Sequence, residues 1–143
     1  MAELPASPDW AALEVGQLIE GERQDLNATT TVLQVNGSQD WYPIHHDAAF
    51  AVGSGHDDVL YNTGWTSATL ARVLTDWIGA NGWLARLTFQ MRKTNGPGHS
   101  IQAKAKVVRT YEESGLHLVD VELWIDNDTN GVTTTGTATV RLP

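Results

Sequence analysis

The chain of 143 residues contains no cysteine, which excludes disulfide scaffolds, thiol nucleophiles and cysteine-based zinc sites. Its sequence has no apolar run close to the roughly 20 residues that a membrane-spanning helix needs. The opening stretch MAELPASPDWAALEVG has neither the basic nor the apolar region of a secretory signal. We therefore expect a cytoplasmic protein that does not associate with membranes.

Basic residues are scarce as well, with 9 lysines and arginines against 17 acidic residues and a formal net charge of −8. This balance argues against nucleic acid as a partner, because nucleic-acid binding needs a basic face. Most of the basic residues lie close together in the sequence, at Arg86, Arg92, Lys93, Lys104, Lys106 and Arg109. They could attract a small anion, or each could be an ordinary solvated side chain on a strand.

Apolar residues make up 41% of the chain and include six tryptophans, a composition typical of a globular protein. Composition and length together predict a single domain over residues 1–143. Residues 1–12 contain Pro5, Pro8 and small polar neighbours, and we expect this segment to be loosely held.

The second half of the chain has the pattern of antiparallel strands. Four segments are rich in strand-forming residues, at 83–93, 100–111, 116–126 and 132–142. Alternation is clearest at 100–111, where one face carries Ile101, Ala103, Ala105 and Val107. Asn-Gly pairs at 95–96 and 130–131 favour tight reversals between antiparallel strands. We therefore predict that the four segments form a meander.

One segment, 64–82, has helical periodicity. Its apolar positions follow the spacing of one helix face, at Leu70, Val73, Leu74, Trp77 and Ile78. Either Asn62 or Thr63 can cap its start, and either Gly79 or Gly82 can end it. One long helix and a curved antiparallel sheet of five or six strands predict an α+β fold whose sheet wraps around the helix. Such a sheet leaves an open edge that a dimer would cover.

Titratable residues are concentrated in QDWYPIHHDAAFA, residues 39–51. Pro43 excludes a regular helix or strand here, and a bent loop can bring Asp40 and His45 together for proton transfer to and from a water. A plain capping loop is the alternative, with Asp47 as the cap of a short helical turn. Neither HHD nor the later HDD has the ligand spacing of a recognised metal site, so we expect no metal.

The segment DWYPIHHDAAFA resembles the signature Asp-x-Asn-Pro-(Ile/Val)-His of the MaoC-like hydratases, which include (R)-specific enoyl-CoA hydratases and related dehydratases of hotdog fold. The matching positions are Asp40, Pro43, Ile44, His45, Asp47 and Ala51. LEVGQLI at 13–19 is similar to the first strand of that family, and NTGWTSATLARVL falls where the family has its central helix. The resemblance therefore covers most of the chain and implies the hotdog fold.

The resemblance also implies an activity, the addition of water to a trans-2-enoyl-CoA thioester or its removal. Asp40 and His45 would then be the catalytic pair, and the backbone N–H of Gly64 would bind the thioester oxygen. Without the resemblance, Gly64 would be interpreted as a packing or turn glycine. No cofactor is implied, since coenzyme A is part of the substrate. Arg86, Arg92 and Lys93 are candidates for contacting its phosphates.

Two positions depart from the family pattern: Tyr42 stands where the family has asparagine, and Thr63 where it has histidine. With Asn62, these residues are expected to bind the acyl group. The string HHD…VLYNTG…LARVLTDWIG resembles the small MaoC-type subunits of actinobacterial steroid side-chain breakdown, which act beside a second hotdog subunit. We therefore expect a homodimer or a heteromer, and a bulky steroid acyl group as one possible substrate.

Two alternative functions are open at this point. The first is a hotdog acyl-CoA thioesterase. A resemblance to such enzymes usually places a catalytic carboxylate on the central helix, and the only acidic residue on this helix is Asp76, near its far end. The second is a non-catalytic hotdog subunit that completes the acyl-CoA site of a partner. The intact Asp40 and His45 argue against it.

Overall fold

The computed structural model describes residues 5–143 and contains five strands and three α-helices. The strands are β1 (Leu18–Asp25), β2 (Trp83–Met91), β3 (Ser100–Glu113), β4 (Leu116–Asn127) and β5 (Gly131–Leu142). The helices are α1 (Ala28–Ser38), α2 (Ala48–Gly53) and α3 (Thr63–Ile78), with short 3-10 turns η1 (Trp10–Ala12) and η2 (Pro43–His45). Within residues 5–143, no helix is both long and apolar enough to cross a bilayer.

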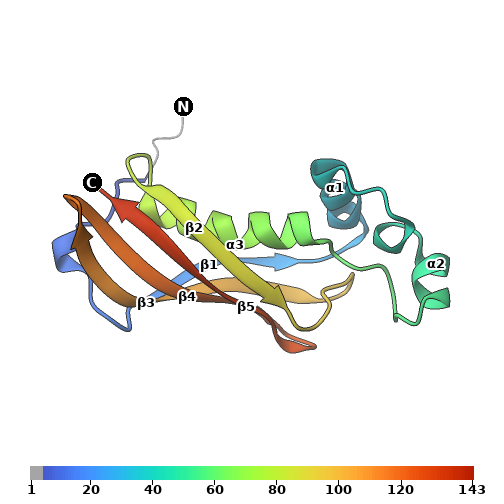
Figure 1. The fold of residues 1–143 in the computed structure, drawn as a ribbon. Coiled ribbons are helices and arrows are strands. Elements are labelled where there is room, and N and C mark those ends of the chain that lie inside the picture. The colour runs from blue at the N-terminus through green and yellow to red at the C-terminus, as the bar shows by residue number, and fades with distance from the viewer. Residues whose placement is uncertain (1–4) are drawn as a thin grey trace.

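A single antiparallel sheet curves around α3 (Figure 1). The apolar face of α3 packs into the sheet through Leu70, Val73, Leu74 and Ile78. The predicted inner face of β3 meets it, because Ile101, Ala103, Ala105 and Val107 are all buried. Burial of a side chain such as Leu74 stabilises the fold by about 1.5–3 kcal/mol. The predicted α+β hotdog fold is confirmed, with five strands.

The predicted four-strand meander is wrong in one respect. The strand order is β1-β3-β4-β5-β2, so β3, β4 and β5 form hairpins while β2 pairs with β5 at the far edge. The Asn-Gly pair at 130–131 lies in a hairpin turn as expected. The pair at 95–96 instead belongs to the connection that crosses from one side of the sheet to the other. Asn95 is buried there and its carbonyl accepts the N–H of Tyr61, 3.0 Å away.

Helix α1 was not predicted from the sequence. Its residues, ATTTVLQVNGS, are mostly weak helix formers. It forms because Asn27 and Thr30 make a capping box, in which the Asn27 side chain accepts the Thr30 N–H and the Thr30 hydroxyl accepts the Asn27 N–H. Its inner face is held by the buried Tyr61, whose hydroxyl lies 2.5 Å from that of Thr30. Tertiary contacts thus override low propensity.

Residues 1–4 of the segment predicted to be loosely held lie outside the described residues, and Trp10 of the same segment packs against the core. The Trp10 indole stacks on the His117 ring with centroids 4.4 Å apart. Its N–H donates to the carbonyl of Leu118 at 3.1 Å. The segment predicted as the first strand, 13–19, has no regular structure before Leu18 except a turn at residues 15 and 16, and β1 begins at Leu18.

Candidate active site

The proline-bent loop brings Asp40 and His45 together. Pro43 occupies the first position of η2, where its fixed φ suits a helical turn and its missing N–H is not needed. The Pro43 carbonyl accepts the N–H groups of both His46 and Asp47, which tightens the turn. As a result, the Nε2 atom of His45 lies 3.3 Å from Oδ2 of Asp40.

The other ring nitrogen of His45 fixes its tautomer. Nδ1 lies 2.7 Å from the backbone carbonyl oxygen of Leu60, which can only accept, so Nδ1 carries the proton. In the neutral ring, Nε2 is therefore the basic nitrogen that faces Asp40. The His45 side chain is 14% exposed and that of Asp40 is 44% exposed, so the pair opens to solvent on the carboxylate side.

Two hydrogen-bond acceptors thus face each other across a short gap. A neutral imidazole and a carboxylate cannot bond directly without a shared proton, whereas a water can donate one O–H to each of them. The lone pairs of such a water would then point away from the pair. This is the arrangement that general-base activation of a water requires.

The amino terminus of α3 supplies free backbone donors. Asn62 caps the helix, with its side-chain oxygen accepting the N–H of Trp65 at 2.8 Å and its carbonyl accepting that of Thr66 at 3.0 Å. Within residues 5–143, the N–H groups of Thr63 and Gly64 have no acceptor. These donors, together with the positive end of the helix dipole, form a site suited to developing negative charge.

The acid–base loop and this helix terminus are joined through the segment that precedes α3. The Leu60 N–H donates to the carbonyl of Ile44 at 3.0 Å, and the Leu60 carbonyl accepts from the His45 ring. Leu60 is two residues before the cap Asn62. The Asp40–His45 pair and the free donors are therefore held by one short stretch of chain, at the end of α3 nearest α1 and α2 (Figure 1).

The three predicted acyl-binding residues have different surroundings. Tyr42 is 56% exposed, and its ring centroid lies 6.4 Å from that of His45 and 5.6 Å from that of Phe50. Thr63 is exposed, and its hydroxyl lies 3.6 Å from the sulfur of Met91. Asn62 is only 2% exposed and both ends of its amide are bonded within the protein, so it is a helix cap rather than an available substrate ligand.

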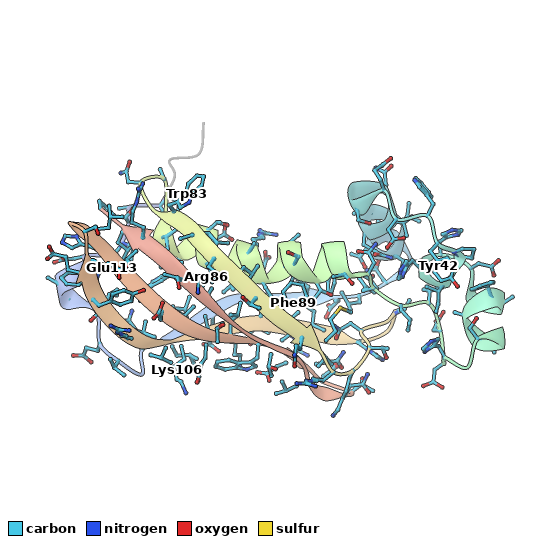
Figure 2. All side chains as sticks on the ribbon, in the orientation of Figure 1. Tyr42, Trp83, Arg86, Phe89, Lys106 and Glu113 are labelled. Carbon is cyan, nitrogen blue, oxygen red and sulfur yellow. The ribbon has the colours of Figure 1, made fainter. Side chains whose placement is uncertain are left out.

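The three basic candidates for phosphate binding lie in two different places. Arg92 and Lys93 directly follow Met91 and are exposed, so they lie near the start of α3. Lys93 donates from Nζ to the carbonyl of Asn130 at 2.6 Å. Arg86 lies five residues before Met91 in β2, which corresponds to about 17 Å of extended strand. Figure 2 shows Arg86 on the sheet, well away from Tyr42.

A groove of about 470 Å³ runs between α1 and the first turns of α3. Its walls include Leu33, Gly37 and Ser38 from α1 and Gly64, Trp65 and Ala68 from α3. The volume is within the range of small-molecule sites. Because Gly64 is part of the wall, a group lying in this groove would pass beside the free backbone donor.

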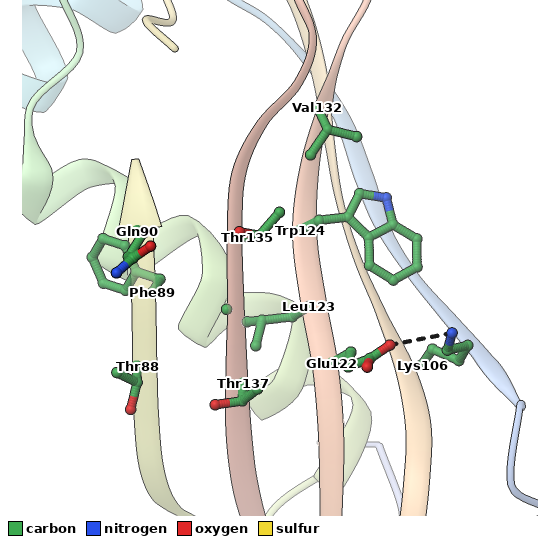
Figure 3. Close-up of a pocket in the computed structure, with 11 residues that line it drawn as sticks. Thr88, Phe89, Gln90, Lys106, Glu122, Leu123, Trp124, Val132, Thr135 and Thr137 are labelled. Carbon is green, nitrogen blue, oxygen red and sulfur yellow. Dashed lines mark ion pairs between the residues drawn. The ribbon is translucent and has the colours of Figure 1, made fainter. Parts of the chain in front are cut away.

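A larger hollow, of about 600 Å³, lies on the face of the sheet opposite α3 (Figure 3). Trp124 and Val132 provide apolar surface, and Lys106 pairs there with Glu122 at 3.2 Å. None of the residues predicted for catalysis or acyl binding lines it. Since its charged groups already neutralise each other, this hollow offers no acid–base chemistry comparable to that of Asp40 and His45.

Sequence reasoning missed the groups that hold the site together. The Leu60 carbonyl and the side chains of Gln34 and Ser38 were not singled out, because helix α1 itself was not expected. The Asn27-x-x-Thr30 capping box was the available signal for that helix. A backbone carbonyl such as that of Leu60 leaves no signal in a sequence.

Neither the models of known protein families nor the curated proteins give a match to the chain. Solved structures with the same fold include R-hydratase PhaJ1 from Pseudomonas aeruginosa, with a TM-score of 0.84, 20% identity, and coverage of 99% of this chain and 89% of that one. A chain of the ChsH1-ChsH2 complex from Mycobacterium tuberculosis has a TM-score of 0.82 and 20% identity, with 91% and 98% covered. A MaoC-like dehydratase from Rhodospirillum rubrum has a TM-score of 0.79 and 19% identity, and the match covers 92% of this chain and 94% of that one. The first and the last of these structures bear the hydratase and dehydratase names that the sequence resemblance pointed to.

Proposed function

We propose that this chain is an enoyl-CoA hydratase, which adds water to a trans-2-enoyl-CoA thioester or catalyses the reverse dehydration. The observation that carries the proposal is the 3.3 Å approach of His45 Nε2 to Asp40 Oδ2 in a loop that Leu60 ties to the segment before the free N–H groups of α3. The structural similarity to hydratases and dehydratases supports it at the level of the fold.

The reaction needs a base for water and a proton for carbon. A water that lies to one side of Asp40 and His45 and donates to both gives one proton to the pair while its oxygen forms a bond to C3 of the substrate. The electrons of the C2–C3 double bond move toward the thioester oxygen. A proton from the pair then reaches C2, so that the product carries both hydrogens of the water and the pair returns to its starting state.

The intermediate enolate places negative charge on the thioester oxygen. In the proposal, the Gly64 N–H donates to that oxygen, with the Thr63 N–H and the helix dipole adding positive potential. A preorganised donor of this kind lowers the barrier by about 3–4 kcal/mol. Glycine also suits the position sterically, because a Cβ there would lie 3.1 Å from Cβ of Ser38 and 3.4 Å from Oδ1 of Asn62.

The groove between α1 and α3 is the proposed site of the acyl group, with Tyr42 and Thr63 at the exposed rim. Arg92 and Lys93 are the proposed contacts for the coenzyme A phosphates, while the position of Arg86 makes it the weaker candidate. A steroid acyl group is one candidate substrate, because the chain resembles the small subunits of steroid breakdown and shares the fold of the ChsH1-ChsH2 complex. No metal or redox cofactor takes part in the proposed reaction.

A second hotdog subunit is the proposed partner, and of the two edge strands of the sheet, β1 and β2, the proposed contact is β2. Strand β2 has a neighbour on one side only, and it exposes Trp83 (63%) and Met91 (38%). Unpaired N–H and C=O groups next to apolar side chains are suited to strand pairing with another chain. A second copy of this chain would extend the sheet without a gap.

The thioesterase alternative is weaker on structural grounds. Asp76 lies near the far end of α3 from Gly64, and its carboxylate pairs with Nε of Arg72 at 3.3 Å. It is therefore separated from the donors that would stabilise a tetrahedral oxyanion. The non-catalytic alternative would leave the convergence of Asp40 and His45 without a purpose.

The experiment that tests the proposed function is incubation of the purified protein with trans-2-enoyl-CoA esters of increasing acyl size. Hydration removes the conjugated double bond, so we expect the absorbance of the enoyl thioester to fall with no release of free thiol. Thiol release would identify a thioesterase instead. Absence of both signals across the series would contradict the proposal for the chain on its own.

A further inference from the structure

Gln34 of α1 connects the two halves of the candidate site. Its side-chain Nε2 donates to the backbone carbonyl of His45 at 3.2 Å. Its Oε1 accepts the backbone N–H of Asn62 at 3.2 Å. The residue is only 4% exposed, so both bonds are shielded from competing water. One amide group therefore touches the loop that carries the base and the cap of the helix that carries the free donors.

The chemistry of the two backbone partners leaves one orientation of this amide. A carbonyl can only accept and an N–H can only donate, so Nε2 must face His45 and Oε1 must face Asn62. A flipped amide would place acceptor against acceptor and donor against donor. The Gln34 side chain thus acts as a spacer of fixed length between the backbones at positions 45 and 62.

Ser38 holds the same helix a turn further on. Its hydroxyl donates to the Gln34 carbonyl at 2.6 Å and accepts from Nδ2 of Asn62 at 2.6 Å. The close fit of Gly64 against Ser38 means that α1 and α3 meet at the free donor itself. The Gln34 backbone carbonyl is therefore linked through Ser38 to Asn62, at the start of α3.

We propose that Gln34 is a positioning residue for hydration, setting the distance between the His45 imidazole and the oxyanion-binding end of α3. The inference rests on the proposed function. Gln34 does not touch the reacting atoms in this account; it acts through His45 and Asn62. A misplacement of about 1 Å between reacting groups can cost on the order of 100-fold in rate. Loss of the spacer should therefore lower kcat while leaving the binding of substrate largely intact.

The first variant is Gln34→Met, which has a similar shape and makes neither hydrogen bond. We expect kcat to fall about 10- to 100-fold and KM to change by less than about threefold. The matched control is Thr31→Val on the same helix. The buried Thr31 hydroxyl donates to the Asn27 carbonyl at 2.9 Å and lies 3.3 Å from the Tyr61 hydroxyl, and within residues 5–143 it makes no hydrogen bond to His45 or Asn62. This control should lower the melting temperature and keep kcat within about threefold.

The second variant, Gln34→Glu, separates positioning from packing. A carboxylate still accepts the Asn62 N–H but cannot donate to the His45 carbonyl, whereas the protonated acid can do both. Burial favours the protonated form. The kcat of this variant, divided by that of the wild type at each pH, should therefore rise as pH is lowered toward about 5. A role in helix packing alone would instead raise the melting temperature at low pH and leave the kcat of the folded protein unchanged.

The outcomes distinguish this inference from the proposed function. If the wild-type protein hydrates no 2-enoyl-CoA ester, both fail. If the wild type is active and Gln34→Met keeps its kcat, or loses no more than Thr31→Val, the positioning role of Gln34 is overturned and the hydratase stands. A kcat loss in Gln34→Met, together with the low-pH recovery of Gln34→Glu, supports the positioning role.

Discussion

The His45 imidazole is held between two oxygen atoms of different character. The Leu60 carbonyl accepts the proton on Nδ1, and the Asp40 carboxylate faces Nε2. The first contact fixes the proton of the neutral ring on Nδ1, and the second contact sets where, in the proposed reaction, a water would be activated. Both depend on the turn that Pro43 begins, so one residue of fixed φ governs the geometry of the pair.

At this scale we predict opposite tautomers for two adjacent histidines. Neutral His45 should carry its proton on Nδ1, because that atom faces the Leu60 carbonyl. Neutral His46 should carry it on Nε2, which lies 3.0 Å from the carbonyl of Trp41. Long-range proton–nitrogen NMR spectra of labelled protein above neutral pH distinguish the two forms. A proton on Nε2 of His45 would contradict the proposed basic nitrogen.

The residues of the pair could be predicted from the sequence, whereas their fixed orientation could not. Asp40 and His45 stood out through the proline between them and through a family resemblance. The Leu60 carbonyl is a backbone group, and the Gln34 side-chain amide binds only backbone groups, so neither contact leaves a signature in the sequence. The sequence predicted two roles for Asn62, a helix cap and a substrate ligand, and could not decide between them. In the structure Asn62 is the cap of α3.

At the scale of elements, the site depends on how α1 and the start of α3 meet. The Asn62 cap holds α3 on one side, and its amide donates to Ser38 of α1 on the other. The periodicity of 64–82 predicted α3 well because an amphipathic helix leaves a regular pattern. It did not predict α1, whose stability comes from its capping box and from Tyr61 rather than from its own residues.

We predict that the cap of α3 contributes more to stability than the cap of α1. Asn62→Ala removes a buried cap and leaves Ser38 without a donor, which should lower the free energy of unfolding by about 2–3 kcal/mol. Asn27→Ala removes an exposed cap and should cost about 1 kcal/mol. Urea unfolding of both variants measures the difference. An equal or smaller loss for Asn62→Ala would be inconsistent with the described junction.

At the scale of the whole molecule, the α1–η2–α2 segment projects from one end of the hotdog body (Figure 1). The body could be predicted from alternation and periodicity. The order of its strands could not be predicted, because β2 pairs with β5, which lies far from it in the sequence, and local turns do not determine such a pairing. That choice leaves β2 at an edge, where a partner can pair with it.

We predict that the protein in solution has twice the 15.6 kDa mass of the chain. The double variant Trp83→Lys with Met91→Lys introduces charge at the β2 edge. Because strand pairing would then have to bury two charged lysines, the protein should shift to the single-chain mass. Val15→Lys is the control, since Val15 is 70% exposed and lies outside β2. Light scattering after gel filtration reports the masses. A wild-type protein of single-chain mass would argue against pairing between copies.

The most direct test of the account is the turnover number of Asp40→Asn with a trans-2-enoyl-CoA ester that the wild type hydrates. Asparagine keeps the size of the side chain but cannot take a proton from water, so we predict a loss of kcat of about 100- to 10,000-fold with an unchanged circular dichroism spectrum. A folded Asp40→Asn protein that hydrates the ester at the wild-type rate would show that the carboxylate beside His45 does not activate the water.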